Sequence, residues 1–228
     1  MSLPSKILIT DFDGTFCTRD FFELAVRPYL DPASPDYWSQ YSAGRITHFD
    51  AMSGFFGHIR CTAAEMDEVL HALAPVPETV DAIAVLRAQG WDVWIVSNGC
   101  EWYIRAVLGI LGVNARVIAS PGEFEPARGL RMSPPTGSPY YNPAYGIEKL
   151  RVFEEARRNF ETVAFAGNGP PDLACALAAR PELRFARTWL ANELRRRGES
   201  FHSFHHWCEI AGRLLQGRRA EQPQLKPP

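Results

Sequence analysis

The sequence predicts an α/β fold, a Rossmann-like, doubly wound parallel sheet with helices on both faces. Three observations lead to this prediction. Short apolar runs alternate along the chain with stretches of helical period, and glycine-containing polar motifs fall at the ends of the apolar runs. A long helical, aromatic-rich segment after the first run predicts a helical cap inserted after the first strand.

Five apolar runs have the length expected of buried strands, and their alternation with helices predicts that they are parallel. The runs are Ile7–Thr10, Trp91–Ser97, Arg116–Ala119, Thr162–Ala166 and Leu183–Ala186. Apolar residues at a helical spacing predict three helices, over Thr79–Gln89, Glu148–Arg158 and Asp172–Ala179. Ligands of such sheets bind beyond the carboxyl ends of the strands, which makes the motifs at those ends candidate site residues.

Two segments interrupt the alternation. Residues 21–76 contain no convincing strand and are predicted to form the helical cap. The stretch Ser120–Gly146 is rich in Pro, Gly and Tyr, and a hairpin is predicted around Arg128 and Gly129 with loop elsewhere. We therefore expect a core domain of residues 1–20 and 77–215 and a disordered tail over residues 216–228.

The composition narrows the functional classes. A net charge of -2 argues against a nucleic-acid partner, and the chain has no apolar run long enough to span a membrane. The N-terminal residues lead straight into the first strand, unlike a signal peptide. The five cysteines are odd in number and lack C-x-x-C spacing. We therefore expect reduced thiols and a cytoplasmic location.

The first strand delivers two carboxylates, Asp11 and Asp13, followed by Gly14 and Thr15. A carboxylate at a strand end can attack phosphorus and form an aspartyl phosphate. A second carboxylate two residues later can give a proton to the leaving oxygen. The alternative is a simple strand-terminal turn, because Asp and Gly are favoured turn residues.

Two further features supply groups that bind phosphate. The run WDVWIV ends in Ser97-Asn98-Gly99, whose hydroxyl and backbone N–H groups are suitable donors to phosphate oxygens. Lys149, near the start of a predicted helix, can neutralise a phosphoryl group and a buried aspartate together. Each has an ordinary alternative, a common turn for the first and a solvated lysine for the second.

The last motif, GNGPPD, follows the predicted strand TVAFA. Asn168 and Asp172 offer oxygen ligands to a hard cation such as Mg²⁺, with Asp172 able to act through water. The alternative is a glycine-rich turn in which Asp172 caps the next helix. Taken together, the four motifs supply the in-line positioning and charge neutralisation that phosphoryl transfer requires.

In this order, DFDGT, SNG, Lys149 and GNGPPD resemble the four-motif signature of the haloacid dehalogenase superfamily of phosphatases. The resemblance covers Lys6–Ala25 and roughly Val76–Phe204, with the helical insertion at the C1 cap position. The cap type and the C-terminal run from Arg184 resemble the phosphoserine phosphatase-like branch. Within it, the nearest likeness is to the 2-hydroxy-3-keto-5-methylthiopentenyl-1-phosphate phosphatases of methionine salvage.

The resemblance implies a Mg²⁺-dependent phosphomonoesterase that hydrolyses a small phosphorylated metabolite. Asp11 would be the nucleophile and a magnesium ligand. Asp13 would protonate the leaving alcohol, later activate water, and offer its backbone carbonyl to the metal. Lys149 would complete the charge neutralisation, and Asn168 and Asp172 would complete the metal site.

The same resemblance implies the substrate-binding residues. Ser97 and the N–H groups of Asn98 and Gly99 would bind the phosphoryl oxygens. Asp20, nine residues after the nucleophile, would face the substrate from the cap hinge, where phosphoserine phosphatases carry an acidic residue.

Three departures limit what can be carried over. Asn168 stands where the family has a metal-binding aspartate, so weaker metal binding is expected. Gly54 and Phe56 stand where phosphoserine phosphatases hold the substrate carboxylate with an arginine, with Arg60 only nearby, so an amino-acid phosphate is not favoured. No cysteine occurs between Glu101 and Ala174, although the methionine-salvage relatives carry a cysteine-bearing stretch there.

Two alternatives therefore stay open beside the hydrolase: a binding or regulatory protein with a weakened metal site, and a phosphotransferase that uses an acceptor other than water. His202, His205 and His206 lack the spacing of a known metal site. We expect them to have a structural role on an aromatic amphipathic helix.

Overall fold

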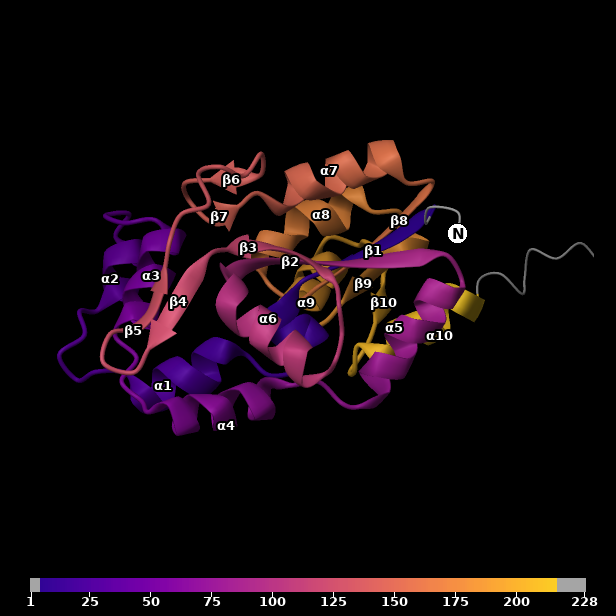
Figure 1. The fold of residues 1–228 in the computed structure, drawn as a ribbon. Coiled ribbons are helices and arrows are strands. Elements are labelled where there is room, and N and C mark those ends of the chain that lie inside the picture. The colour runs from indigo at the N-terminus through magenta and orange to yellow at the C-terminus, as the bar shows by residue number, and fades with distance from the viewer. Residues whose placement is uncertain (1–4, 217–228) are drawn as a thin grey trace, which may run out of the picture.

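The computed structural model describes residues 5–216 (Figure 1). Six parallel strands form the central sheet in the order β10-β9-β8-β1-β2-β3. The bounds of these strands are β1 Lys6–Thr10, β2 Trp91–Cys100, β3 Arg116–Ser120, β8 Thr162–Gly167, β9 Arg184–Ala186 and β10 His202–Ser203. β1 lies between β2 and β8, so the residues that follow it emerge at the middle of the sheet.

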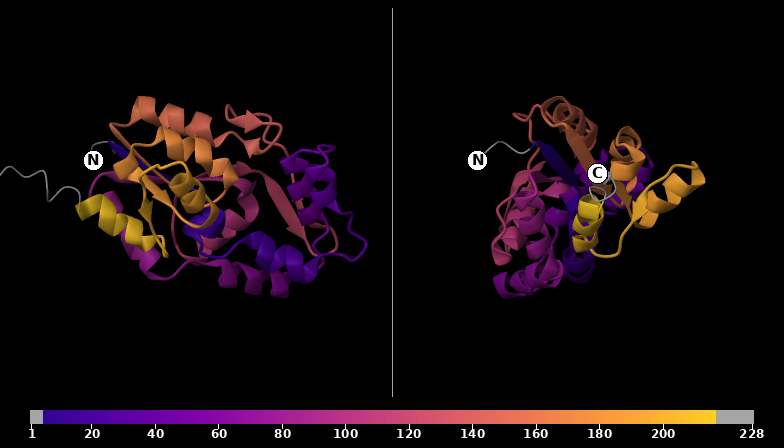
Figure 2. Two further views of the ribbon diagram at one scale, coloured as in Figure 1. Left: turned by 180° about the vertical axis from the view of Figure 1, so that it is seen from behind. Right: turned by 90° about the vertical axis from the view of Figure 1, so that its right-hand side faces the viewer.

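Helices cover both faces of this sheet, as the two views of Figure 2 show. The helices of the core are α5 Glu78–Ala88, α6 Glu101–Ile110, α7 Lys149–Asn159, α8 Leu173–Ala178, α9 Thr188–Arg196 and α10 Cys208–Gln216. Side chains of β1 alternate between the two faces. Leu8 joins one hydrophobic cluster, whereas Ile7 and Ile9 join the other, and all three are fully buried.

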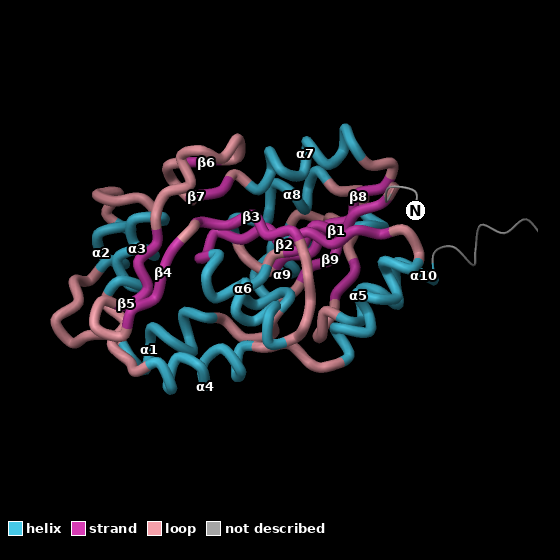
Figure 3. Tube along the Cα trace, viewed as in Figure 1, coloured by secondary structure: helices cyan, strands magenta, loops and turns pink. Residues whose placement is uncertain are grey.

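The segment between β1 and α5 is helical and lies at one end of the sheet (Figures 1 and 3). Its helices are α1 Arg27–Tyr29, α2 Tyr37–Ser42, α3 His48–Gly57 and α4 Ala63–Leu73. Two capping boxes begin the longer helices: Thr47 and Asp50 exchange hydrogen bonds at the start of α3, and Thr62 and Glu65 do so at the start of α4. The cap helices are therefore specified locally, by short-range sequence signals.

Two small hairpins follow β3. The antiparallel pair β4 Gly122–Glu125 and β5 Gly129–Met132 packs against α3, where the Ser53 hydroxyl donates to the Met132 carbonyl at 3.2 Å. The pair β6 Tyr141–Asn142 and β7 Gly146–Ile147 lies beside β2 and β3. The first hairpin thus adds a contact between core and cap to the two points where the chain enters and leaves the cap.

The predicted fold class, with its helical insertion after the first strand, is confirmed. Each predicted strand is present within three residues of its expected ends, and the hairpin around Arg128 and Gly129 forms. The domain boundaries stay a prediction, and the predicted disordered tail lies, except for Gln216, outside the described residues.

Two predictions of secondary structure are wrong. The segment with His202, His205 and His206 is not a helix, because His202–Ser203 pairs with β9 as an edge strand and α10 begins only at Cys208. The β6–β7 hairpin was expected to be loop. Both errors concern strands of two residues, which are too short to show a period in the sequence.

Within residues 5–216, no single helix is long and apolar enough to cross a bilayer. Helices α4 and α5, which are joined at a bend, are long and apolar enough for a span only when they are counted together.

Candidate active site

A buried lysine connects the first and last motifs. Lys149 is the first residue of α7, and its Nζ lies 2.8 Å from Asp11 Oδ1 and 2.7 Å from Asp172 Oδ1. Burial opposes the charge of Lys149, but the two carboxylates outweigh this effect and raise its pKa. Burial and the nearby Asp172 raise the pKa of Asp11 to about 7, against the opposing influence of Lys149.

The two oxygens of Asp11 differ in their surroundings. Oδ1 accepts hydrogen bonds from Lys149 and, at 2.7 Å, from the backbone N–H of Phe12. Oδ2 accepts none from the part of the chain that the structure describes, and Asp11 lines a pocket. The backbone is held as firmly, since Asp11 N donates to Ala166 O at 2.9 Å across the sheet. One carboxylate oxygen is thereby oriented with its lone pairs free to react.

Asp172 lies behind this pair. It is fully buried, and its second oxygen, Oδ2, accepts the N–H groups of Asn168 and Gly169 at 2.9 Å each. It does not line the pocket. In the structure Asp172 positions Lys149, and its expected role toward a metal, direct or through water, stays a prediction. One oxygen of the Asp172 carboxylate contacts Lys149 and the other accepts the two N–H groups, so a metal would have to share these oxygens.

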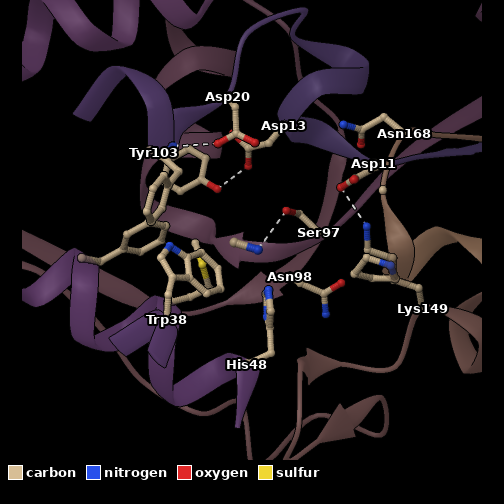
Figure 4. Close-up of a pocket in the computed structure, with 16 residues that line it drawn as sticks. Asp11, Asp13, Asp20, Trp38, His48, Ser97, Asn98, Tyr103, Lys149 and Asn168 are labelled. Atoms are coloured by element: carbon tan, nitrogen blue, oxygen red, sulfur yellow. Dashed lines mark hydrogen bonds and ion pairs between the residues drawn. The ribbon is translucent and has the colours of Figure 1, made fainter. Parts of the chain in front are cut away.

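Asp13 lies across the site from Lys149, beside the ring of Tyr103 (Figure 4). Its Oδ2 accepts a hydrogen bond of 2.5 Å from the Tyr103 hydroxyl, and its Oδ1 accepts the Phe21 N–H at 2.9 Å. The Tyr103 ring stacks on Phe21 with centroids 4.1 Å apart and planes 2° from parallel. Burial and the negative charge of Asp20 raise the pKa of Asp13 well above its usual range, although both hydrogen bonds oppose this. Figure 4 shows Tyr103, Asp13 and Asp20 together on one side of the site.

The Ser97-Asn98-Gly99 motif occupies an irregular stretch of β2 where its register with β3 shifts. Ser97 Oγ accepts the Gly99 N–H at 3.0 Å, so the hydroxyl proton is free to point elsewhere. Asn98 Nδ2 donates to two carbonyls, Tyr145 O at 2.9 Å and Ile147 O at 2.8 Å. The Asn98 side chain thereby fastens the β6–β7 hairpin beside the site. This contact was not predicted from the sequence.

The Asn168 side chain packs against the turn formed by Gly14 and Thr15. Its Oδ1 accepts a hydrogen bond from Thr15 Oγ1 at 3.1 Å, and a Cβ on Gly14 would lie only 2.2 Å from its Nδ2. Gly14 also has a φ of 65°, a left-handed conformation that favours glycine. The glycine of the first motif is thus needed both for the turn and for the close approach of Asn168.

All the predicted site residues except Asp172 line one pocket of about 250 Å³. The predicted residues that line it are Asp11, Asp13, Asp20, Ser97, Asn98, Gly99, Lys149 and Asn168. The pocket also contains Phe56, already noted in the cap sequence, and residues that sequence reasoning did not single out for the site, chiefly Phe22, Trp38, His48, Met52 and Tyr103. Most of these come from the cap, whose contacts with the core no local pattern reveals.

The family model for haloacid dehalogenase-like hydrolases matches residues 8–177 of this chain. The chain belongs to this family. The family and the enzyme class predicted from the sequence are thus confirmed, whereas the likeness to the methionine-salvage phosphatases stays a prediction. No curated protein matches the chain at a significant level.

Solved structures share the fold of this hydrolase at low sequence identity. A phosphoserine phosphohydrolase-like protein from Francisella tularensis is 18% identical with a TM-score of 0.61, over 91% of this chain and 98% of that one. A haloacid dehalogenase family hydrolase from Salmonella enterica is 19% identical with a TM-score of 0.61, over 90% and 68%. A probable phosphoserine phosphatase from Vibrio cholerae is 15% identical with a TM-score of 0.61, over 95% and 67%.

The donors available to a cation in this hydrolase are oxygens. Asp11 contributes a carboxylate oxygen, Asn168 contributes an amide oxygen, and the backbone carbonyl of Asp13 belongs to the same turn as Asp11. Carboxylate and carbonyl oxygens suit Mg²⁺ rather than a soft metal. Within the described residues no cluster of three or more His, Cys, Asp or Glu side chains is arranged to hold a metal. The donor set fits Mg²⁺, with a neutral ligand at the third position.

Proposed function

We propose that this hydrolase is a Mg²⁺-dependent phosphomonoesterase, which cleaves a small phosphorylated metabolite through an aspartyl phosphate on Asp11. The observation that carries the proposal is that two buried carboxylates in one pocket have different surroundings, one suited to attack and the other to proton transfer. Asp11 is held through one oxygen by Lys149 and keeps the other for attack, while Asp13, with its raised pKa, is suited to carry a proton.

In the first step, Asp11 Oδ2 attacks phosphorus and the bond from phosphorus to the leaving oxygen breaks. Asp13, as the carboxylic acid, gives its proton to that oxygen, so a neutral alcohol leaves. In the second step, Asp13, now a carboxylate, accepts a proton from water as the water oxygen attacks phosphorus. The bond from phosphorus to Asp11 breaks and inorganic phosphate leaves. Asp11 is again a carboxylate and Asp13 again a carboxylic acid.

Three groups would stabilise the negative charge of the phosphoryl group, two of them as cations and one as a hydrogen-bond donor. Lys149 and the Ser97 hydroxyl line the pocket on the side of Asp11, as Figure 4 shows. Mg²⁺ held by Asp11, Asn168 and the Asp13 carbonyl would supply Lewis-acid stabilisation of the developing charge. Gly99 N donates to Ser97 Oγ, so its expected role as a phosphate donor requires this hydrogen bond to rearrange.

The test is hydrolysis of para-nitrophenyl phosphate in the presence and absence of Mg²⁺. Wild-type protein should turn over the ester, chelation should abolish turnover, and Asp11→Asn should lower kcat by about 1000-fold or more. Asp92→Asn is a matched control, since Asp92 bonds to Val93 N and the Trp94 indole on β2, outside the pocket. Equal inactivity of wild type and Asp11→Asn over a broad panel of phosphate esters would end the proposal.

Asn168 favours a second candidate, a ligand-binding or regulatory protein with reduced catalysis. Its neutral oxygen already accepts a hydrogen bond from Thr15 and lacks the charge that a third carboxylate ligand would bring. The variant Asn168→Asp separates the two functions. A large gain in both turnover and Mg²⁺ affinity supports the weakened site, and unchanged turnover supports an enzyme adapted to asparagine.

A further inference from the structure

The charges that line the pocket leave no cation for a substrate carboxylate. Among the lining residues within 5–216, Lys149 is the one Lys or Arg, and it is already shared by Asp11 and Asp172. Arg60, in the cap, is not in the lining. Its side chain lies 3.4 Å from Asp31 and donates to two backbone carbonyls of its own segment. A second anion on the substrate would find no partner.

Asp20 makes the same region unfavourable for anions. It lines the pocket, and it accepts the Phe22 N–H at 2.7 Å, which fixes its carboxylate at the entry to the cap. No ion pair with Asp20 occurs among residues 5–216. A carboxylate or second phosphate beside the ester would therefore share the pocket with an acidic side chain that makes no ion pair in the described part of the chain.

The cap side of the pocket is instead apolar. Its lining includes Phe22, Trp38, Met52 and Phe56. Trp38 packs on Phe22 with ring centroids 5.7 Å apart, yet it keeps 39% of its surface exposed. Phe56 is buried, whereas Phe22, Trp38 and Met52 keep part of their surface accessible and offer binding energy to an apolar group.

Two polar atoms in this lining, Asn98 Oδ1 and His48 Nδ1, are buried without a hydrogen-bond partner in the part of the chain that the structure describes. The orientation of the Asn98 amide is settled by its two hydrogen bonds to carbonyls, which can accept but not donate. Its Oδ1 must therefore point away from them as an unsatisfied acceptor. Figure 4 shows His48 and Asn98 near each other on the same side of the pocket. A buried polar atom without a partner requires an explanation, and a ligand hydroxyl supplies one.

We infer that the organic part of the substrate is an uncharged, mainly apolar group with a hydroxyl close to the ester. The apolar body contacts Trp38, Phe22 and Met52, and the hydroxyl donates to Asn98 Oδ1. Phosphate esters that carry a carboxylate or a second phosphate in this position are rejected. The inference rests on the proposed function, because it names the substrate class of the same site.

Matched pairs of esters test it. Benzyl phosphate and para-carboxybenzyl phosphate differ by one carboxylate group. The ester without the carboxylate should have a kcat/KM higher by a factor of about 10 to 100. Phenethyl phosphate and its β-hydroxy derivative differ only in the hydroxyl, and the derivative should be preferred by about 10-fold. Met52→Arg should narrow or reverse the first preference, since it adds the missing cation.

The apolar contact is tested with two tryptophans. Trp38→Ala should raise the KM for benzyl phosphate about 10-fold, whereas Trp189→Ala, which truncates a ring 43% exposed on α9, should leave it unchanged. If both members of each pair react equally and depend on Asp11, the substrate inference is overturned while the proposed function stands. If no ester shows Asp11-dependent turnover, both fail.

Discussion

The hydroxyl of Tyr103 makes the most informative single contact in the site, and Tyr103→Phe removes it with little change of shape. The ring stack on Phe21 is retained, and Asp13 keeps its hydrogen bond from the Phe21 N–H. Asp13 gains negative charge as it gives its proton to the leaving oxygen, and a hydrogen bond to a charged acceptor contributes about 1.5–3 kcal/mol. If that energy positions Asp13 in the transition state, kcat/KM for a poor leaving group should fall by a factor of about 10 to 100.

The assay compares two leaving groups. Benzyl alcohol needs the proton of Asp13 to leave, whereas para-nitrophenol is stable as an anion. Because kcat/KM reports the steps through phosphoryl transfer to Asp11, Tyr103→Phe should reduce it strongly for benzyl phosphate and by less than about 3-fold for para-nitrophenyl phosphate. The control is Tyr140→Phe, which removes a tyrosine hydroxyl that donates to Glu155 at 2.9 Å outside the pocket.

Equal losses for the two esters would refute this reasoning, since they would show a general disturbance of the site. A loss confined to KM would do the same, because positioning of the acid acts on the transition state.

Three further predictions concern stability. In the metal-free protein, burial raises the pKa of Asp11 from an ordinary 3.8 to about 7, so the native state binds more protons than the unfolded state between these values. The free energy of unfolding, measured with urea in the presence of a chelator, should therefore fall as the pH rises from about 4 to about 7, and Asp11→Asn should weaken this slope. Lys149→Met leaves two buried carboxylates without their cation and should cost about 3–5 kcal/mol in the same assay, with partial recovery on adding Asp172→Asn. Gly14→Ala should destabilise the protein by more than Gly44→Ala: both glycines are left-handed, but only at Gly14 does a Cβ meet another residue, Asn168 at 2.2 Å. Equal urea midpoints for the two alanine variants would show that this contact carries no energy.

The sequence predicts the sheet and the gathering of its motifs because both depend on local signals. Apolar runs of four or more residues specify the long strands, and parallel strands bring their carboxyl ends to one edge. Asp11, Ser97, Lys149 and Asn168 meet around the pocket for this reason. By contrast, the β6–β7 hairpin and β10 are set by long-range contacts that leave no period in the sequence.

The pairing of Asp172 with Lys149 could not be predicted from the motifs alone. Asp172 and Asn168 are both oxygen ligands by type, and only the geometry shows that Asp172 is fully engaged by Lys149 and two N–H groups. Tyr103 likewise has no signal beyond its position after the SNG motif. Its contact with Asp13 joins residues 90 positions apart in the chain, from different elements of the core.

The central claim, an aspartyl phosphate on Asp11, is tested most directly by trapping the intermediate. Asp13→Asn removes the base that activates water, so the variant should accumulate the intermediate when mixed with para-nitrophenyl phosphate and Mg²⁺. Rapid acid quench and peptide mass spectrometry should then find one phosphoryl group, labile to base, on the peptide that contains Asp11. An initial burst of para-nitrophenol without this modification, or the modification on another residue, would contradict the account.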